Sequence, residues 1–284
     1  MKKIGFIDLY ISEWHANNYP AWIKGVCKEK GLDYEVAYAW AEQDVSVVDG
    51  KTTDTWCTEN GIEKCNTIEE LCEKSDYIVI LAPSNPEVHL KYAEIALKYK
   101  KRTYIDKTFA PDFNTAKAIF DIANAYGTSF FSTSALRYAT ELAPVEKKCS
   151  TITVTGSGAS FDEYGIHVIE MCVKTMGIGA KAVRAEKAGD QYLMRIDYKN
   201  GKFANIVFDG NYGTPFTIMP CGEDGKTVWK LVESDSFNGL MTAILNFFED
   251  GKLPFDTNET LEVMKVRDAL IKATTKTGKW IKVK

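Results

Sequence analysis

In the first half of the chain, short apolar runs alternate with segments whose apolar residues recur every three or four positions. Short apolar runs indicate buried strands, and the longer repeat indicates helices with one apolar face. We expect strands at Lys3–Asp8, Tyr34–Trp40, Asp76–Ala82, Thr103–Asp106 and Ser129–Ala135. We expect helices at Trp14–Lys30, from Thr67 onward, around Tyr92–Tyr99 and around Ile119–Tyr126. This alternation predicts a Rossmann-type α/β domain over residues 1–138, with a doubly wound parallel sheet and a polar loop at 41–66.

After about residue 140 the pattern changes to β-branched and alternating runs, which are typical of an antiparallel sheet. The predicted strands are Thr151–Thr155, Gln191–Tyr198, Phe203–Phe208 and Thr227–Val232, and the Asn200-Gly201 pair predicts a tight hairpin turn. Helices are expected at Phe161–Met176 and Asn258–Thr275, the second with Asp256 and Glu259 as a cap. Residues 139–284 therefore form an α+β domain with an open, mainly antiparallel sheet.

Composition narrows the classes of partner. A length of 284 residues fits two domains, and the net charge of −4 with a pI near 5.6 gives no basic surface for nucleic acid or anionic membrane. No apolar run approaches the roughly 18 residues that span a bilayer, and the amino terminus shows no signal-peptide pattern. We therefore expect a cytoplasmic protein whose partner is a small molecule.

Seven cysteines, an odd number, show no CxxC spacing, and the chain has three histidines. This predicts reduced, mostly buried thiols and no structural metal site.

Candidate chemistry gathers where the predicted parallel strands end. Ligands of such sheets bind at the carboxyl ends of the strands. Asp8, the loop Pro83–Pro86, Lys107 and Ser134–Arg137 all follow predicted strands, so we expect them to share a crevice. A lysine after a strand is often a solvated loop residue, but Lys107 beside Asp106 could instead polarise a carbonyl or relay a proton.

The predicted helix Phe161–Met176 has a polar stripe made by Glu163, His167, Glu170 and Lys174. One interpretation is a solvated helix face. The other is a face lining the crevice, with His167 as the proton-transfer group. A metal at Glu163 and His167 is disfavoured because no third ligand is evident.

These features resemble the Gfo/Idh/MocA oxidoreductases over nearly the whole chain. Asp106-Lys107-Thr108 stands where that family has Glu-Lys-Pro, and Glu163-Tyr-Gly-Ile-His167 is similar to its Asp-x-Gly-x-His motif. His89 before a helix, Leu136-Arg137-Tyr138 and the ending Thr277–Val283 are also family-like.

The resemblance implies catalytic roles for Lys107, His167 and Glu163, with the lysine binding substrate and nicotinamide and the histidine acting as acid or base. It implies NAD or NADP as cofactor, and a homodimer or homotetramer formed through the carboxyl-terminal sheet. The residues it places around the cofactor are Asp8, Tyr10, Ser84, Asp106, Lys107 and Arg137.

The sequence departs from the family at the first turn, where the Gly-x-Gly-x-x-Gly positions hold Asp8, Tyr10 and Glu13. The acids would repel a diphosphate and the tyrosine would fill its space. Near the position of the ribose-binding acid, Glu42 is a poor substitute. Two interpretations stay open: an NAD(P)-dependent oxidoreductase of sugars or polyols that binds its cofactor weakly, or a relative without redox activity. The latter would be a binding or regulatory protein, or a cofactor-independent lyase or isomerase.

Overall fold

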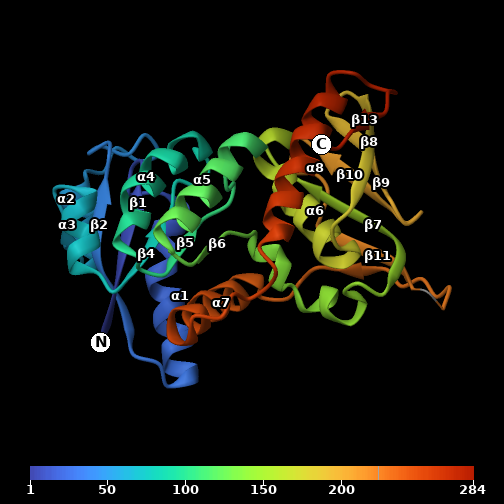
Figure 1. Cartoon of the computed structure of the whole chain (residues 1–284). Coiled ribbons are helices and arrows are strands. Elements are labelled where there is room, and N and C mark those ends of the chain that lie inside the picture. Colours follow the sequence, from blue (N-terminus) through green and yellow to red (C-terminus); the bar gives the residue numbers. More distant parts are fainter. Residues whose placement is uncertain (223) are drawn as a thin grey trace. The chain divides into compact units, whose positions relative to one another are not determined.

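Six parallel strands form the first sheet of the computed structural model, which describes residues 1–222 and 224–284 (Figure 1). Their order is β3-β2-β1-β4-β5-β6, so the predicted doubly wound parallel sheet is confirmed. The order reverses between β1 and β4, so the carboxyl ends of these strands form the candidate site. The strands are β1 (Lys2–Asp8), β2 (Tyr34–Ala41), β3 (Glu63–Lys64), β4 (Tyr77–Ile80), β5 (Thr103–Ile105) and β6 (Phe130–Phe131).

The helices that join these strands begin and end at local capping signals. Helix α1 runs over the predicted range, Trp14–Lys30, and ends at Gly31, whose φ of 67° suits a glycine. At α3, Thr67 caps the backbone N–H of Glu70, as the capping box predicts, but Glu70 reaches back to the N–H of Asn66 instead of Thr67. Besides α1, the helices between these strands are α2 (Thr53–Asn60), α3 (Ile68–Lys74), η1 (Pro86–Val88), α4 (His89–Ala96), η2 (Leu97–Tyr99) and α5 (Phe113–Tyr126).

Helix α2 is the main correction to the first half, because residues 41–66 were expected to be mostly loop. Thr52 caps α2, and Trp56 within it is 1% exposed. The Trp56 ring nitrogen donates a 2.6 Å hydrogen bond to Asn17 of α1. A tertiary contact therefore stabilises a helix whose local sequence carries turn signals.

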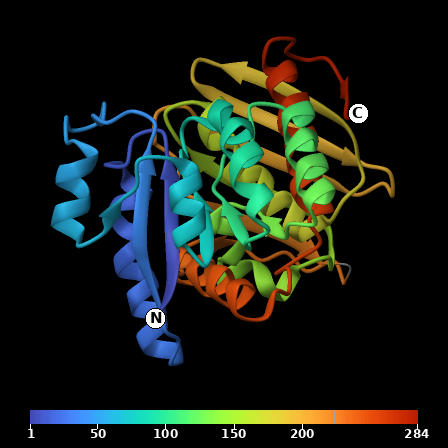
Figure 2. The same cartoon turned by 60° about the vertical axis from the view of Figure 1, so that its left-hand side comes forward.

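A segment from the second half packs against this first sheet. The chain forms two compact units: unit 1 is Met1–Thr133 with Leu240–Phe255, and unit 2 is Ser134–Gly239 with Asp256–Lys284. The returning segment includes most of α7 (Ser236–Asp250), a helix not predicted from the sequence. In unit 1, Phe248 of α7 stacks on Tyr77 with ring centroids 4.6 Å apart. Helices α4 and α5 lie on the face of the sheet opposite α1 and α7 (Figures 1 and 2).

The second sheet belongs to unit 2 and has seven strands in the order β12-β11-β7-β10-β9-β8-β13. All neighbouring pairs are antiparallel except β7 and β10, so the predicted mainly antiparallel sheet is confirmed. Strands β8 and β11 and the two-residue strand β13 were not predicted. The strands are β7 (Cys149–Ser157), β8 (Ala180–Ala188), β9 (Gln191–Tyr198), β10 (Phe203–Asp209), β11 (Thr217–Gly222), β12 (Lys230–Leu231) and β13 (Ile281–Lys282).

Helices α6 (Phe161–Met176) and α8 (Asn258–Thr274) cover one face of this sheet (Figure 1). The range of α6 agrees with the prediction. The expected cap of α8 by Asp256 and Glu259 is wrong, because Asp256 accepts from the N–H of Asn258 and the Glu259 carboxylate pairs with arginine and lysine. Two short helices, η3 (Ala135–Tyr138) and η4 (Thr140–Val145), precede β7.

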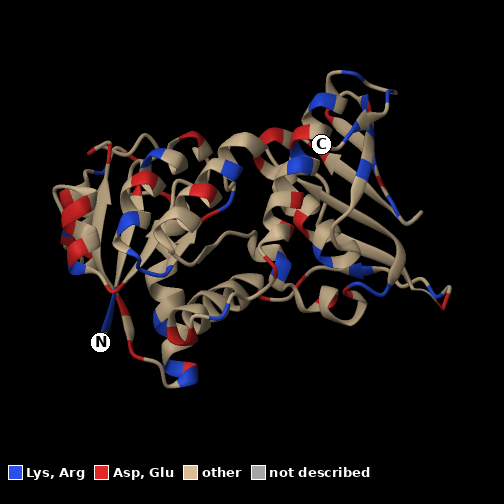
Figure 3. Ribbon diagram, in the orientation of Figure 1, with Lys and Arg blue, Asp and Glu red and all other residues tan. Residues whose placement is uncertain are grey.

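Positions of acidic and basic residues are interspersed along the ribbon of each unit (Figure 3). Within residues 1–222 and 224–284, no helix combines the length and the apolar character needed to cross a membrane.

Candidate functional site

Asp106 lies directly after β5 and is fully buried, with its carboxylate at the centre of a hydrogen-bond network. One oxygen is hydrogen-bonded to the ring Nδ1 of His15 and accepts from the Tyr19 hydroxyl at 3.1 Å. The other accepts from the Tyr104 hydroxyl at 3.1 Å and from the backbone N–H of Lys107 at 2.8 Å. These donors are suited to a carboxylate, and they fix the start of the Lys107 loop.

Lys107 is 8% exposed, so the interpretation of a solvated loop lysine is wrong. Its Nζ lies 3.5 Å from the carbonyl oxygen of Pro83, and the Lys107–Thr108 peptide bond is cis. His89 links the loop after β5 to the end of β4. Its two ring nitrogens lie 2.9 and 2.5 Å from the carbonyl oxygens of Phe109 and Leu81. The structure therefore brings Lys107 and the loop after β4 together, as predicted.

Glu13 occupies the amino terminus of α1 with its own carboxylate. It is 6% exposed and accepts hydrogen bonds from the backbone N–H groups of His15, at 2.8 Å, and Ala16. These are the donors that a helix amino terminus offers to an anion. The site is thus filled by an anion that belongs to the chain.

Asp8, at the end of β1, adds a second buried carboxyl group. Its Oδ1 accepts from the backbone N–H groups of Leu9 and Ala82, at 2.7 and 3.1 Å. Its Oδ2 is buried and has no hydrogen-bond partner among the described residues. An orphaned buried oxygen of this kind is stabilised by a proton.

The three buried acids differ in the direction of their pKa shifts. The pKa values of Asp8 and Glu13 are raised, and that of Asp106 is lowered. Burial, reinforced by the charge of Glu13, raises the pKa of Asp8 well above its usual range. Burial also raises the pKa of Glu13, against the opposing charge of His15. At Asp106 burial acts in the same direction, but the charge and hydrogen bond of His15 and the charge of Lys107 outweigh it, and the pKa is lowered.

The segment after β2 packs against the turn between β1 and α1. Backbone N–H groups of Glu42 and Gln43 donate to the carbonyl oxygens of Asp8 and Leu9. The Ser12 hydroxyl donates to Asp49 at 2.8 Å. Glu42 itself pairs with Lys91 at 2.6 Å and accepts from Tyr92 at 2.8 Å.

These contacts do not fit a dinucleotide bound in the manner that a Gly-x-Gly-x-x-Gly turn supports. A diphosphate at α1 would compete with the Glu13 carboxylate for the same N–H groups, and buried Asp8 would lie beside it. The Glu42 carboxylate, which could have held a ribose hydroxyl, is engaged by α4. The remaining predicted cofactor residues of unit 1, Tyr10 and Ser84, are partly buried and exposed, respectively, in the loops after β1 and β4.

In unit 2, His167 lies at the middle of α6 and is partly buried. Its ring Nδ1 is 2.7 Å from the hydroxyl oxygen of Ser134, which also caps the backbone N–H of Leu136. This contact orients the imidazole. Glu163 begins the same stripe one turn earlier, where its N–H is capped by Ser160 at 3.2 Å.

The rest of the stripe is covered by the chain, so the interpretation of a fully solvated face is wrong. Glu170 is 2% exposed and pairs with the guanidinium of Arg137. Glu259 of α8 pairs with the same guanidinium at 2.7 Å. Lys174 donates to the carbonyl oxygen of Arg137 at 2.6 Å. Arg137, a predicted cofactor residue, is thus paired with two carboxylates within unit 2.

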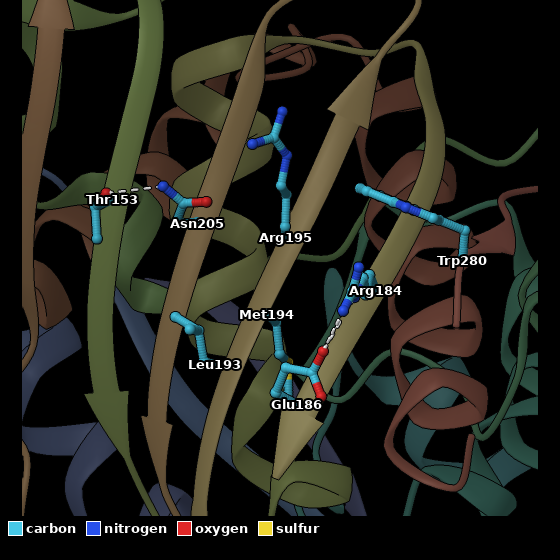
Figure 4. Close-up of a pocket in the computed structure, with 8 residues that line it drawn as sticks. All are labelled: Thr153, Arg184, Glu186, Leu193, Met194, Arg195, Asn205 and Trp280. Carbon is cyan, nitrogen blue, oxygen red and sulfur yellow. Dashed lines mark hydrogen bonds and ion pairs between the residues drawn. The ribbon is translucent and has the colours of Figure 1, made fainter. Parts of the chain in front are cut away.

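The face of the second sheet opposite α6 and α8 carries a hollow of about 520 Å³ (Figure 4). Arg184 and Glu186 of β8 form an ion pair on its wall, and Trp280 borders it. Leu193, which points from β9 into this surface, is 56% exposed.

All seven cysteines are unpaired in the structure and six are buried, as predicted. Within the described part of the chain, no cluster of three or more His, Cys, Asp or Glu side chains is arranged to hold a metal ion.

The predictions from the sequence missed the three side-chain partners of Asp106, which are His15, Tyr19 and Tyr104, and the capping role of Glu13. His15 lies 91 positions from Asp106, and no local spacing links them. Glu13 was recognised as an obstacle to phosphate but not as a helix cap. A cap signal was present, because Glu13 directly precedes the predicted helix start at Trp14.

Comparison with solved structures gives full-length matches. A probable dehydrogenase from Thermotoga maritima has a TM-score of 0.81 at 14% identity, covering 99% of this chain and 98% of that one. GenD2 from gentamicin A biosynthesis, solved with NAD, has a TM-score of 0.77 at 12% identity, with coverage of 100% and 97%. An oxidoreductase from Agrobacterium radiobacter, solved with NAD⁺, L-tartaric acid and magnesium, has a TM-score of 0.74 at 14% identity, with coverage of 99% and 98%.

No protein-family model and no curated protein matches the sequence. The structural matches establish the fold, which is that of the Gfo/Idh/MocA-type NAD-binding oxidoreductases, as the resemblance implies.

Proposed function

We propose that this protein processes a sugar, polyol or related hydroxy or keto compound by proton transfer, without a dinucleotide at the β1–α1 turn. The observation that carries the proposal is the Glu13 carboxylate, which accepts the backbone N–H groups at the amino terminus of α1. A buried carboxylate on these N–H groups occupies the position at which a diphosphate usually binds. The substrate class follows from the resemblance and from the L-tartaric acid, a hydroxy acid, in one neighbouring structure.

The reaction class is that of an isomerase or lyase. His167 takes a proton from the carbon next to a carbonyl, and the ammonium of Lys107 stabilises the negative oxygen of the resulting enediolate. Returning the proton to the neighbouring carbon completes an isomerisation. Expelling a β-hydroxyl as water completes a dehydration. Neither route needs electrons from outside the substrate.

Exchange of substrate protons with solvent tests this proposal. The purified protein is incubated in D₂O with D-fructose or 2-keto-myo-inositol, and the loss of the C–H signal next to the carbonyl is followed by NMR. We expect exchange that is lost in Lys107→Ala and His167→Asn. Exchange at the uncatalysed rate with every ketone tested would contradict the proposal.

The second candidate is an NAD(P)-dependent dehydrogenase of a sugar or polyol, with Lys107 and His167 in substrate binding and proton transfer and Glu163 supporting His167. It is favoured by the neighbouring structures that contain NAD. It requires the dinucleotide to bind in another pose, away from Glu13. Oxidation of polyols coupled to NADH formation would support this candidate.

We also propose a homodimer or homotetramer formed through the open face of the second sheet. Exposed apolar side chains that border one hollow on this face support the proposal, since such side chains gathered in one patch are typical of interfaces. They are Leu193 and Trp280, which are 56 and 46% exposed.

A further inference from the structure

The ring of His15 links the amino terminus of α1 to the residue that precedes Lys107. Its Nδ1 is hydrogen-bonded to one carboxylate oxygen of Asp106, and the two side chains are 7 and 0% exposed. The other oxygen of that carboxylate accepts the backbone N–H of Lys107 at 2.8 Å. One carboxylate therefore connects the histidine to the lysine, and all three residues belong to unit 1.

The imidazole ring is held by its neighbours on α1. It stacks on the ring of Tyr19, with centroids 5.1 Å apart and an interplanar angle of 19°, and it meets the ring of Trp14 edge-on at 5.3 Å. The backbone N–H of the same histidine donates to the Glu13 carboxylate at 2.8 Å. A side chain held in this way loses little conformational entropy when its Nδ1 binds the Asp106 carboxylate.

His15 differs from the other side chains that bind this carboxylate. Among the described residues these are His15, Tyr19 and Tyr104, and the histidine alone of the three can carry a positive charge. A buried carboxylate stays ionised only where hydrogen bonds and opposite charge offset the loss of water. Burial raises the pKa of Asp106, but the charge and hydrogen bond of His15, together with the charge of Lys107, outweigh it and lower the pKa.

An ionised Asp106 fixes Lys107 in two ways. It accepts the backbone N–H of the lysine, and its charge attracts the ammonium group. Pro83 supports the loop from the other side, because its carbonyl oxygen accepts the backbone N–H of Thr108 at 3.2 Å and lies 3.5 Å from Lys107 Nζ. A neutral or displaced Asp106 would remove the first of these supports, and the ammonium would then be less firmly placed.

We propose that His15 is a positioning residue, which acts through the Asp106 carboxylate to hold the Lys107 ammonium where it stabilises the negative oxygen of the substrate. This inference rests on the proposed function and deepens it, because it assigns a role in the reaction to a residue in the first turn of α1. Since the histidine acts through the lysine, its removal should slow the reaction only as far as the lysine contributes.

NMR of the full chain with ¹³C-labelled lysine measures the placement of Lys107 without any substrate. The Cε signal of Lys107 is assigned by its absence in Lys107→Arg. We expect the two Hε protons of a fixed lysine to give separate signals in wild type, and to merge at the position of exposed lysines in His15→Ala. Asn17→Ala is the control on the same helix: it removes the acceptor of the Trp56 ring nitrogen and should leave the Lys107 signals unchanged.

Two further substitutions separate the hydrogen bond from the packing of the ring. His15→Phe keeps a ring between Trp14 and Tyr19 but has no N–H to donate, so it should give the same merged signals as His15→Ala. His15→Asn keeps a side-chain N–H near the position of Nδ1 and should retain the separate signals. Circular dichroism spectra confirm that each variant is folded, and His15→Phe carries the test if His15→Ala is not.

The proton-exchange assay in D₂O measures the same role in the reaction. His15→Ala should slow exchange about tenfold or more, as expected for the loss of a hydrogen bond to a charged group, whereas His15→Asn should stay within about threefold of wild type. Added to Lys107→Ala, the same His15→Ala substitution should cause no further loss of the residual rate. A merely structural histidine would lower the rate in both backgrounds.

The outcomes separate this inference from the proposed function. Lys107 signals that merge in His15→Ala, without proton exchange in wild type, support the positioning of the lysine by His15 and contradict the proposed function. Proton exchange in wild type, with Lys107 signals that neither His15→Ala nor His15→Phe changes, supports the function and overturns the role of His15. An equal loss of rate with and without the lysine, or merged signals already in wild type, also overturns that role.

Discussion

The carboxylate of Glu13 accepts a 2.8 Å hydrogen bond from the backbone N–H of His15, in the first turn of the helix that Glu13 caps. The same position in a dinucleotide-binding fold is held by glycine, and the N–H groups there face a diphosphate. In this protein the Glu13 carboxylate therefore occupies the position of the diphosphate at the start of α1.

The first prediction concerns the stability that this cap provides. Glu13→Ala leaves the N–H groups of His15 and Ala16 without their acceptor and should lower the free energy of unfolding by about 1 kcal/mol. Glu13→Gln keeps a carbonyl acceptor and should lose less. Urea unfolding followed by circular dichroism measures both. A Glu13→Ala variant as stable as wild type would show that the cap contributes nothing.

The second prediction concerns the pH dependence of stability at Asp8. Its folded pKa is raised above the unfolded value of 3.8, so its contribution is fully present below that value and is lost as pH rises towards the folded pKa. Asp8→Asn removes this loss. The free energy of unfolding of Asp8→Asn should thus improve relative to wild type as the pH rises above about 4.

Asp106 serves as a control because its pKa is shifted in the opposite direction to that of Asp8. Its folded pKa is lowered, so its contribution is present above the unfolded pKa and is lost as pH falls through the folded one. The deficit of Asp106→Asn against wild type should therefore shrink as the solution is acidified. The same pH trend for both variants would contradict the assigned shifts.

The third prediction tests Arg137 as a structural residue of unit 2. Arg137→Ala leaves the buried carboxylates of Glu170 and Glu259 without their partner and should cost about 3 to 5 kcal/mol of stability. The exposed pair of Arg184 and Glu186 is the control, and Arg184→Ala should cost less than about 1 kcal/mol. Chemical unfolding of both variants provides the comparison, and equal losses would contradict this role.

Much of the fold could be predicted because its signals are local. Helix α1 ends at Gly31 and helix α6 keeps a regular apolar stripe, so their ranges follow from the sequence. Helix α7 also has an apolar stripe, in Leu240, Ile244 and Phe248, although it was not predicted. That this segment packs in unit 1 depends on tertiary contacts with residues more than 100 positions away, such as Tyr77.

The missed strands have weak local signals. Strand β8 is rich in alanine and lysine, which are uncommon in strands, and β11 contains Pro220. Both are stabilised by pairing in the sheet instead. In the candidate site, too, local signals could be read and distant contacts could not. Lys107 and His167 could be found from motifs, whereas the contact between His15 and Asp106 exists only in the folded chain.

The fourth prediction asks whether Lys107 and His167 act on one substrate. Lys107→Ala and His167→Asn should each slow proton exchange about 100-fold or more. The double variant should be no slower than roughly the slower single variant, because groups that act in one step are not additive. Purely multiplicative losses in the exchange rate would indicate independent roles.

The fifth prediction concerns the open sheet face. Leu193→Asp places a charge in the exposed apolar patch and should convert an oligomer to monomer, as measured by light scattering after size-exclusion chromatography. Val228→Asp changes another exposed apolar residue of unit 2 and should leave the mass unchanged. A wild-type monomer would contradict the proposed interface.

The β1–α1 turn holds a carboxylate where a dinucleotide would place its diphosphate. Titration of NADH and NADPH into the wild-type protein, followed by nicotinamide fluorescence, measures whether this carboxylate excludes the cofactor. We expect no saturable binding below about 1 mM, a Kd equivalent to roughly −4 kcal/mol. Micromolar or tighter binding of either nucleotide would show that the Glu13 carboxylate does not exclude the dinucleotide.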